Sequence, residues 1–165
     1  MAVVALATVT SSTAFAAGGS RVEARGNVTF EPNQRIEDTL QWHGGELSVK
    51  SGERLTIVSN DELPGEPHVF TIVRAQEQPQ TLDELGVSCG TCQDALAAHD
   101  PDGNGLPPFT LVVNKGKPGI DTVGDSFILF DGATITPRVT AKPGTTLFFI
   151  CSIHNEMQGV LHVTS

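Results

Sequence analysis

Three metal-binding side chains stand close together near the end of this 165-residue chain, and they constrain its fold more than any other feature. Cys151, His154 and Met157 follow one another at three-residue steps, directly after the apolar run of residues 147–150. A trigonal site of two histidines and one cysteine with a weak axial methionine suits electron-transfer copper. His68 is the candidate for the second histidine. A chance grouping of a buried cysteine, a surface histidine and a core methionine is the alternative, but the shared spacing after an apolar run favours a metal site.

Short apolar runs alternate with Gly, Pro, Asn and Asp along most of the chain. Many short strands with regular turn signals are typical of an antiparallel sandwich or barrel. The pattern therefore predicts an all-β fold, a Greek-key β-sandwich. The expected strands are residues 22–30, 46–49, 54–60, 68–74, 109–113, 125–130, 134–141, 145–151 and 158–163.

Residues 76–108 depart from this pattern and are expected to form a short helical insertion between strands. Two helical pieces are predicted at residues 81–85 and 91–99, with Thr91 or Ser88 as the cap of the second. A loop follows in which Asp100, Asp102 and Asn104 have the odd-position spacing of a calcium loop. No acidic residue closes it where a calcium-binding EF-hand would have one, so a turn-rich surface loop is the favoured interpretation.

Residues 1–16 are expected to be a secretory signal peptide. Residues 2–16 are uncharged, apolar and rich in small side chains, and they end in Ala14-Phe15-Ala16 before a Gly-Gly-Ser stretch. The basic start of such a signal is missing, which leaves its true beginning open. The run is too short and too rich in Ser and Thr for a membrane span, and no other segment is a candidate. We therefore expect one domain over residues 17–165, exported to the periplasm or the extracellular space.

The formal net charge of −9 limits the partners that this chain can bind. Binding of nucleic acid needs a basic stripe, and none is visible in the sequence. An acidic surface suits solubility and encounters with basic patches on other proteins. We expect a monomer whose protein partners carry basic docking patches.

Three cysteines in an exported protein leave one unpaired if two form a disulfide. Cys89 and Cys92 are expected to pair locally, which leaves Cys151 free as a metal ligand. Free thiols, or redox or metal roles for the pair, are weaker alternatives. A zinc site made of Cys89, Cys92, Cys151 and His154 is a sharper rival. It would leave His68 without a role.

The end of the chain resembles the cupredoxins, the plastocyanin and azurin family of type 1 blue copper proteins. Residues 140–163 are similar to the last two strands and ligand loop of that family, and the Cys-x2-His-x2-Met spacing is similar to that of amicyanin. Residues 52–61 followed by Pro67-His68 resemble the segment that delivers the first histidine. Together the resemblance covers about residues 45–74 and 109–165.

The resemblance implies one copper ion, bound in a plane by His68, Cys151 and His154 with Met157 axial. In the family a polar residue that braces the ligand loop often follows the first histidine, whereas this chain has Val69. The bracing is then expected from Asn60 or from the backbone.

The resemblance also implies a carrier of single electrons rather than an enzyme. Copper storage or delivery, or an accessory domain of a copper oxidase or nitrite-reductase-like enzyme, are the alternatives. Multicopper catalysis needs His-x-His pairs, which this chain lacks, and His43, His99 and His162 stand alone as surface or packing residues. Electrons are expected to pass through the edge of His154, where the acids ring the metal and steer a basic partner. These acids are Asp61, Glu62, Glu66 and Glu156.

Overall fold

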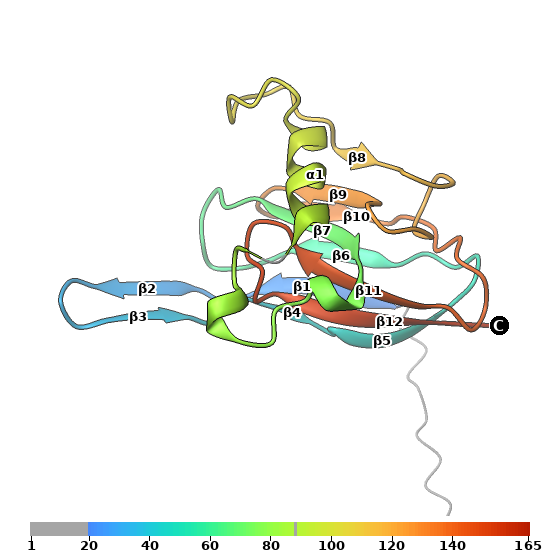
Figure 1. The fold of residues 1–165 in the computed structure, drawn as a ribbon, viewed down its shortest axis with the longest axis horizontal. Helices are drawn as coiled ribbons and strands as arrows, with labels where there is room; N and C mark the ends of the chain where they lie inside the picture. Colours follow the sequence, from blue (N-terminus) through green and yellow to red (C-terminus); the bar gives the residue numbers. More distant parts are fainter. Residues whose placement is uncertain (1–19, 88) are drawn as a thin grey trace, which may run out of the picture.

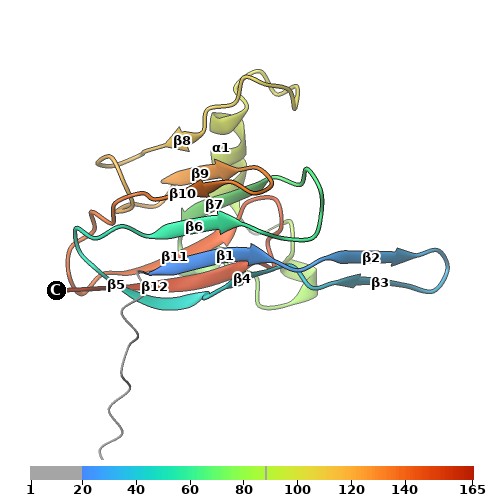
Figure 2. The same cartoon turned by 180° about the vertical axis from the view of Figure 1, so that it is seen from behind.

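Two β-sheets pack face to face in the computed structural model, which describes residues 20–87 and 89–165 (Figures 1 and 2). The predicted all-β sandwich is confirmed. The smaller sheet has the strand order β10 (Thr134–Ile135), β6 (Thr56–Ser59), β1 (Arg21–Arg25) and β4 (Gln41–His43). The larger sheet has the order β5 (Glu46–Lys50), β12 (Gln158–Thr164), β11 (Thr146–Cys151), β7 (His68–Val73), β9 (Ser126–Leu129) and β8 (Val112–Val113).

The core lies between the two sheets and is built from the inward-facing residues of each strand. Ile57 from one sheet and Phe70, Phe149 and Leu161 from the other are completely buried. The rings of Phe70 and Phe149 stack with their centroids 4.6 Å apart, as β7 and β11 pair side by side. This packing fixes the two strands whose ends carry the candidate ligands.

The insertion covers the outer face of the larger sheet. It contains two 3-10 turns, η1 (Ala75–Glu77) and η2 (Leu82–Glu84), and the helix α1 (Gly90–His99), which packs against β7. All six residues of β7 are buried, because the core covers one face of the strand and the insertion covers the other. The helical insertion is thus confirmed.

The predicted cap of this helix is wrong. Cys89 is the N-cap, and its sulfur accepts a hydrogen bond from the backbone N–H of Cys92. Thr91 lies inside the helix and binds the Glu77 carboxylate instead, while Ser88 lies outside the described residues. Cys89 and Cys92 form a disulfide, so the predicted local pairing is confirmed.

The expected strand over residues 22–30 is two strands, which are separated by a break at residues 26–27. Gly26 has a φ of 115°, and a Cβ there would meet the Thr39 carbonyl oxygen, so glycine is required at this crossing. Beyond it, β2 (Val28–Glu31) and β3 (Arg35–Asp38) form a hairpin that extends past the end of the sandwich (Figures 1 and 2). The sequence pattern predicts neither β3 nor β4.

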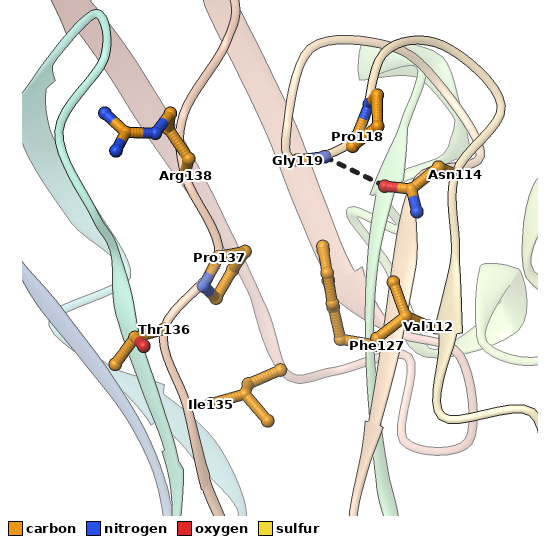
Figure 3. Close-up of a pocket in the computed structure, with 9 residues that line it drawn as sticks. All are labelled: Val112, Asn114, Pro118, Gly119, Phe127, Ile135, Thr136, Pro137 and Arg138. Atoms are coloured by element: carbon orange, nitrogen blue, oxygen red, sulfur yellow. Dashed lines mark hydrogen bonds between the residues drawn. The ribbon is translucent and has the colours of Figure 1, made fainter.

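The expected strand over residues 134–141 is reduced to β10. Pro137 has no N–H to donate, and beyond it only the isolated bridges of Arg138 and Val139 continue the pairing. A cavity of about 350 Å³ lies between this segment and strands β8 and β9 (Figure 3). Its lining contains no His, Cys, Asp or Glu, so it does not resemble a metal site.

None of the helices in the described part of the chain combines the length and the apolar character that crossing a membrane requires. The predicted signal peptide, residues 1–16, lies outside the described residues.

A buried carboxylate on β1 ties the smaller sheet to the loop that precedes His68. Glu23 accepts hydrogen bonds from Arg25 at 2.8 Å and from the side-chain amide of Asn60 at 2.7 Å. The Arg25 hydrogen bond contributes most to lowering the pKa of Glu23, which falls to about 2 despite the opposing effect of burial. Because the folded pKa is below the unfolded one, ionised Glu23 stabilises the fold above the usual carboxyl range, and this contribution is lost as the pH falls towards 2.

We therefore predict that Glu23→Gln flattens the acid limb of the stability profile. Between about pH 5 and pH 3 the free energy of unfolding should fall more in the wild-type protein than in the variant. In this range Glu23 takes up a proton when the wild type unfolds, whereas the glutamine of the variant does not titrate. Urea denaturation at both pH values measures the difference. Equal losses in the two proteins would contradict the role given to Glu23.

Candidate metal centre

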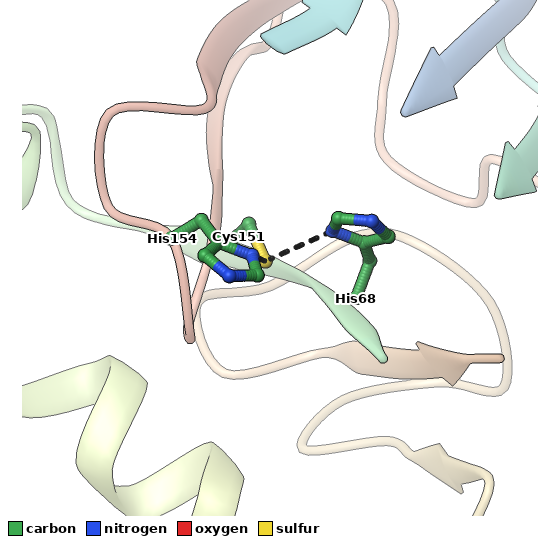
Figure 4. Close-up of side chains that lie close together, drawn as sticks. All are labelled: His68, Cys151 and His154. Atoms are coloured by element: carbon green, nitrogen blue, oxygen red, sulfur yellow. Dashed lines mark hydrogen bonds between the residues drawn. The ribbon is translucent and has the colours of Figure 1, made fainter. Parts of the chain in front are cut away.

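Neighbouring strands bring the predicted ligands together at one end of the larger sheet. His68 is the first residue of β7 and Cys151 the last of β11, where Cys151 pairs with Phe70. The turn after Cys151 returns His154 to the same place (Figure 4). One donor atom from each of His68, Cys151 and His154 lies within 4.8 Å of the other two. His68 and Cys151 are completely buried, whereas the His154 side chain is 17% exposed.

Both imidazole rings present the same nitrogen to the cysteine. The Nδ1 atoms of His68 and His154 each lie 3.8 Å from Cys151 Sγ. The opposite nitrogens face carboxylates: His68 Nε2 is 2.8 Å from Asp61, and His154 Nε2 is 3.1 Å from Glu66. A neutral imidazole whose Nε2–H donates to a carboxylate has its lone pair on Nδ1. The two carboxylates thus leave both Nδ1 lone pairs directed towards the cysteine.

The electrostatics of His68 and Asp61 favour this tautomer. Burial lowers the pKa of His68, against the raising effect of Asp61, so the imidazole is neutral at neutral pH. Burial raises the pKa of Asp61, but hydrogen bonds from the Leu63 amide and from His68 outweigh it and hold the pKa below its usual value. The pair is a neutral imidazole donating to a carboxylate, a partner arrangement found around metal-binding histidines.

The Cys151 thiol is buried, and no described residue beside it carries a positive charge that would favour its ionised form. Burial raises its pKa to about 11, although backbone N–H groups, including that of Val69 at 3.4 Å, act in the other direction. At neutral pH the group is therefore a thiol. A cation bound beside the sulfur would displace this proton.

Backbone hydrogen bonds close the ligand turn. The Cys151 N–H donates to the Met157 carbonyl at 2.8 Å, and the Met157 N–H donates to the His154 carbonyl at 3.0 Å. The side-chain amide of Asn155 donates to the Cys151 carbonyl at 3.0 Å, inside the turn. The spacing of Cys151, His154 and Met157 is thus held by the fold of one tight turn.

Contacts with β7 brace this turn from the side. The Ser152 N–H donates to the Val69 carbonyl at 2.9 Å, and the hydroxyls of Ser152 and Thr71 lie 2.7 Å apart. Asn60 binds Glu23 instead. Of the two expected sources of bracing in place of a polar residue at position 69, the backbone is therefore the one that contacts the ligand turn.

The three donors have the separation that a trigonal metal site needs. Bonds of about 2.3 Å to sulfur and 2.0 Å to nitrogen, set 120° apart, separate the two atoms by roughly 3.7 Å. Both nitrogen–sulfur separations are 3.8 Å. The two nitrogen–sulfur separations of the donor set therefore match those of a trigonal metal site, and all three donor atoms lie within 4.8 Å of one another.

Met157 is completely buried at the end of the hydrophobic core. Its backbone closes the ligand turn, which places the residue beside the donor cluster. Burial in the core alone would also account for a methionine here. Its role as an axial ligand therefore stays a prediction.

The rival sites do not have the required geometry. The disulfide between Cys89 and Cys92 removes two of the four ligands of the proposed zinc site. In the calcium-like loop, Asp100 and Asn104 accept hydrogen bonds from backbone N–H groups of the loop itself, as in a surface turn. Among the lone histidines, His99 is buried and lies 2.7 Å from the Ser126 hydroxyl, which is a packing role.

Asp61 and Glu66, which the sequence predicts as steering charges at the surface, have different roles in the structure. Asp61 is not a surface charge around the metal, because its side chain is completely buried against His68. Glu66 is one-third exposed and contacts His154 directly. The sequence grouped these residues as steering charges and missed their contacts with the ligands. The signal available was the position of each acid in the short loop before His68, although that loop does not reveal which side chain turns inward.

Trp42 is a further residue that the sequence does not mark. It is buried on β4, and its ring meets His68 edge-on with the centroids 5.9 Å apart. The same ring contacts Phe70 at 5.7 Å. Trp42 thereby restricts the imidazole from the side of the smaller sheet.

An apolar hollow of about 370 Å³ adjoins both ligand loops. Pro67 and Ile153, each next to a candidate ligand, line it, and its other apolar residues are Leu96 and Ala97 of α1, Ile128 of β9, Phe109 and Phe130. Ile153 is 38% exposed. The surface beside His154 is therefore apolar on this side.

Comparisons with known proteins place the chain beside copper proteins only loosely. No family model and no curated protein matches the sequence. Similar solved structures include reduced auracyanin from the photosynthetic bacterium Roseiflexus castenholzii, at 18% identity, covering 90% of this chain and 100% of that chain with a TM-score of 0.45. A purple cupredoxin from Nitrosopumilus maritimus has 12% identity, covers 88% and 99%, and has the same TM-score of 0.45.

A copper-containing nitrite reductase from Thermus scotoductus is also similar, at 14% identity and a TM-score of 0.42. It covers 96% of this chain but 25% of that one. These identities and TM-scores are too low to assign the site, whose chemistry follows from its own donor atoms.

We predict that Asp61→Asn weakens binding of a divalent first-row metal by about 10- to 100-fold, because the amide holds the imidazole without the negative charge. Competition titration with a chromogenic chelator measures the affinity. Glu62→Gln is the matched control, since Glu62 is an exposed neighbour outside the cluster, and it should leave the affinity unchanged. Equal affinities of Asp61→Asn and wild type would contradict the orienting role of Asp61.

Proposed function

We propose that this protein is an exported mononuclear copper protein of the cupredoxin type that carries single electrons between redox partners. The observation that carries the proposal is the orientation of the two imidazoles. Both Nδ1 atoms lie 3.8 Å from Cys151 Sγ, and both Nε2 atoms are held by carboxylates. Residues 17–165 form the copper-binding domain in this proposal.

The donor set favours copper over other first-row metals. Two imidazoles with one thiolate and a weak methionine suit copper, which as Cu(I) prefers soft sulfur and as Cu(II) accepts imidazole. When bound, copper supplies a one-electron couple. In this proposal His68, Cys151 and His154 would hold the copper ion, and Met157 would be its fourth, weaker ligand.

The chain's own part in electron transfer is to hold these ligands still. Cys151 and His68 are fixed by paired strands, and His154 is fixed by the braced turn. A site that need not rearrange between oxidation states exchanges electrons with little reorganisation. The partly exposed edge of His154, beside Ile153, is the proposed exit to a partner.

Burial of the candidate ligands favours a permanently bound copper ion over copper storage or delivery. Copper storage or delivery, the alternative function, needs ligands that a receiving protein can reach. His68 and Cys151 are completely buried, which supports retention of the ion. We therefore adopt the cupredoxin-type function of electron transfer without catalysis. In this proposal the protein is a monomer and its redox partners are basic.

We predict that Cys151→Ser abolishes the strong visible charge-transfer band of the copper-loaded protein, because only the thiolate produces that transition. Visible absorption measures the band, and far-ultraviolet circular dichroism should show an intact sandwich. His43→Asn, which changes an exposed histidine outside the cluster, is the control and should keep the band. An unchanged band in Cys151→Ser would refute the copper assignment.

We predict that Met157→Leu keeps copper bound and raises its reduction potential, because loss of a weak axial donor disfavours Cu(II) more than Cu(I). Protein-film voltammetry measures the potential. An unchanged potential would show that Met157 is core packing rather than a ligand.

A further inference from the structure

The β2–β3 hairpin, residues 28–38, is an arm with two unlike faces. In its antiparallel register Phe30 lies opposite Ile36, so these two side chains share a face with Val28. Their exposures are 66% for Phe30, 72% for Ile36 and 36% for Val28. The other face is charged.

On that charged face, Arg35 forms ion pairs with Glu31 at 3.1 Å and with Glu37 at 3.0 Å. These pairs lie on the charged face and leave Phe30 and Ile36 exposed. A two-stranded hairpin alone is marginally stable in water, and an exposed apolar face adds to its cost. An arm of this kind indicates a surface that another molecule covers.

The arm is rooted at the metal end of the sandwich. It continues the β1–β4 pair outward, and β4 carries Trp42, whose ring contacts His68 (Figures 1 and 2). At its base the Gly26 carbonyl accepts the N–H of Glu62, in the loop that precedes His68, at 3.0 Å.

The apolar face also adjoins the ligand turn. Asp38 lies opposite Val28 and therefore on the same face as Phe30 and Ile36. Its carboxylate neighbours Glu156, which stands between His154 and Met157 in the turn. A protein seated against the ligand turn would reach the apolar face of the arm.

The charges around the arm indicate what kind of molecule binds its apolar face. Besides the buried Asp61, the loops at residues 60–68 and 151–158 contain Glu62, Glu66 and Glu156 and no lysine or arginine, and the arm adds Glu31, Glu37 and Asp38 against Arg35. A surface with this composition attracts a basic protein and repels a second copy of a chain whose net charge is −9.

The area of the apolar face agrees with a transient complex. Three side chains, each counted at no more than the roughly 250 Å² of a large aromatic, do not reach the about 800 Å² per partner of a stable interface. Weak redox encounters lie at the low end of interface size. A stable dimer through this face alone is therefore disfavoured.

We propose that the arm is a docking element for a basic redox protein, whose apolar patch covers Phe30 and Ile36 while its cations meet the surrounding carboxylates. The inference rests on the proposed electron-transfer function. One electron leaves the reduced centre and reduces the partner's metal, for example a ferric haem to the ferrous state, and no proton moves. The arm acts on the lifetime of the encounter, not on the metal site.

The test compares oxidation of the reduced copper-loaded protein by a basic ferric cytochrome c and by tris(1,10-phenanthroline)cobalt(III), a small and strongly oxidising cation, followed by stopped-flow absorption. The small cation needs no docking surface. The double variant Phe30→Ser, Ile36→Ser changes exposed side chains only. We expect its second-order rate with cytochrome c to fall by about 30-fold, the lower limit for an interface hot spot, and its rate with the cobalt complex to stay that of the wild type.

Leu106→Ser is the matched control, since Leu106 is 64% exposed on the loop after α1, and both of its rates should stay unchanged. An unchanged cytochrome c rate in the double variant would overturn the proposal. An equal loss of both rates would overturn it too, because the arm would then support the metal site. If sedimentation showed that the wild type is a dimer and the double variant a monomer, the face would be assigned to a second copy of the chain. Failure of the wild type to react with either oxidant would instead refute the electron-transfer function.

Discussion

The pairing of β7 with β11 is the constraint on which the rest of the structure depends. Their register sets Cys151 opposite Phe70, two residues from His68, at the point where both strands reach the end of the sheet. The stacked rings of Phe70 and Phe149 hold this register inside the core. A slip by one residue would turn the cysteine to the other face of the sheet and separate it from the histidine.

Two buried or half-buried carboxylates then decide the chemistry of the cluster. An imidazole left without a partner would be free to rotate and to hold its proton on either nitrogen. Asp61 and Glu66 remove this freedom for His68 and His154. Burial of Asp61 beside a candidate metal ligand would also offset part of the positive charge of a bound ion, so that a buried cation, two carboxylates and a thiolate would compensate one another.

Sequence and structure agree where the signal is local. The ligand turn, most of the strands of the larger sheet, the helical insertion and the Cys89–Cys92 disulfide follow from periodicity, turn residues and spacing. The sequence does not predict β3 and β4, because residues 33–43 are largely polar. The pairing of β3 with β2 also depends on the turn at Asn33, which has a φ of 59°. A hairpin whose faces are both exposed leaves no alternation of buried and exposed positions to detect.

The contacts of the site are less accessible to sequence reasoning than its ligands. Asp61 lies seven residues before His68, across a loop containing Pro64 and Gly65, and only the path of that loop directs its carboxylate inward. Trp42 reaches His68 from the other sheet, a contact between strands far apart in sequence. Tertiary contacts of this kind are set by how the two sheets pack, which residue spacing does not encode.

We propose that the fold sets the metal-binding geometry before the metal binds. Crystal structures of the metal-free and copper-loaded protein, superposed on the strands of the larger sheet, are the decisive test. We predict that His68, Cys151 and His154 keep their rotamers and shift by no more than about 0.5 Å, with copper between both Nδ1 atoms and the sulfur. Rotation of either imidazole away from its carboxylate, or copper bound elsewhere, would contradict the account.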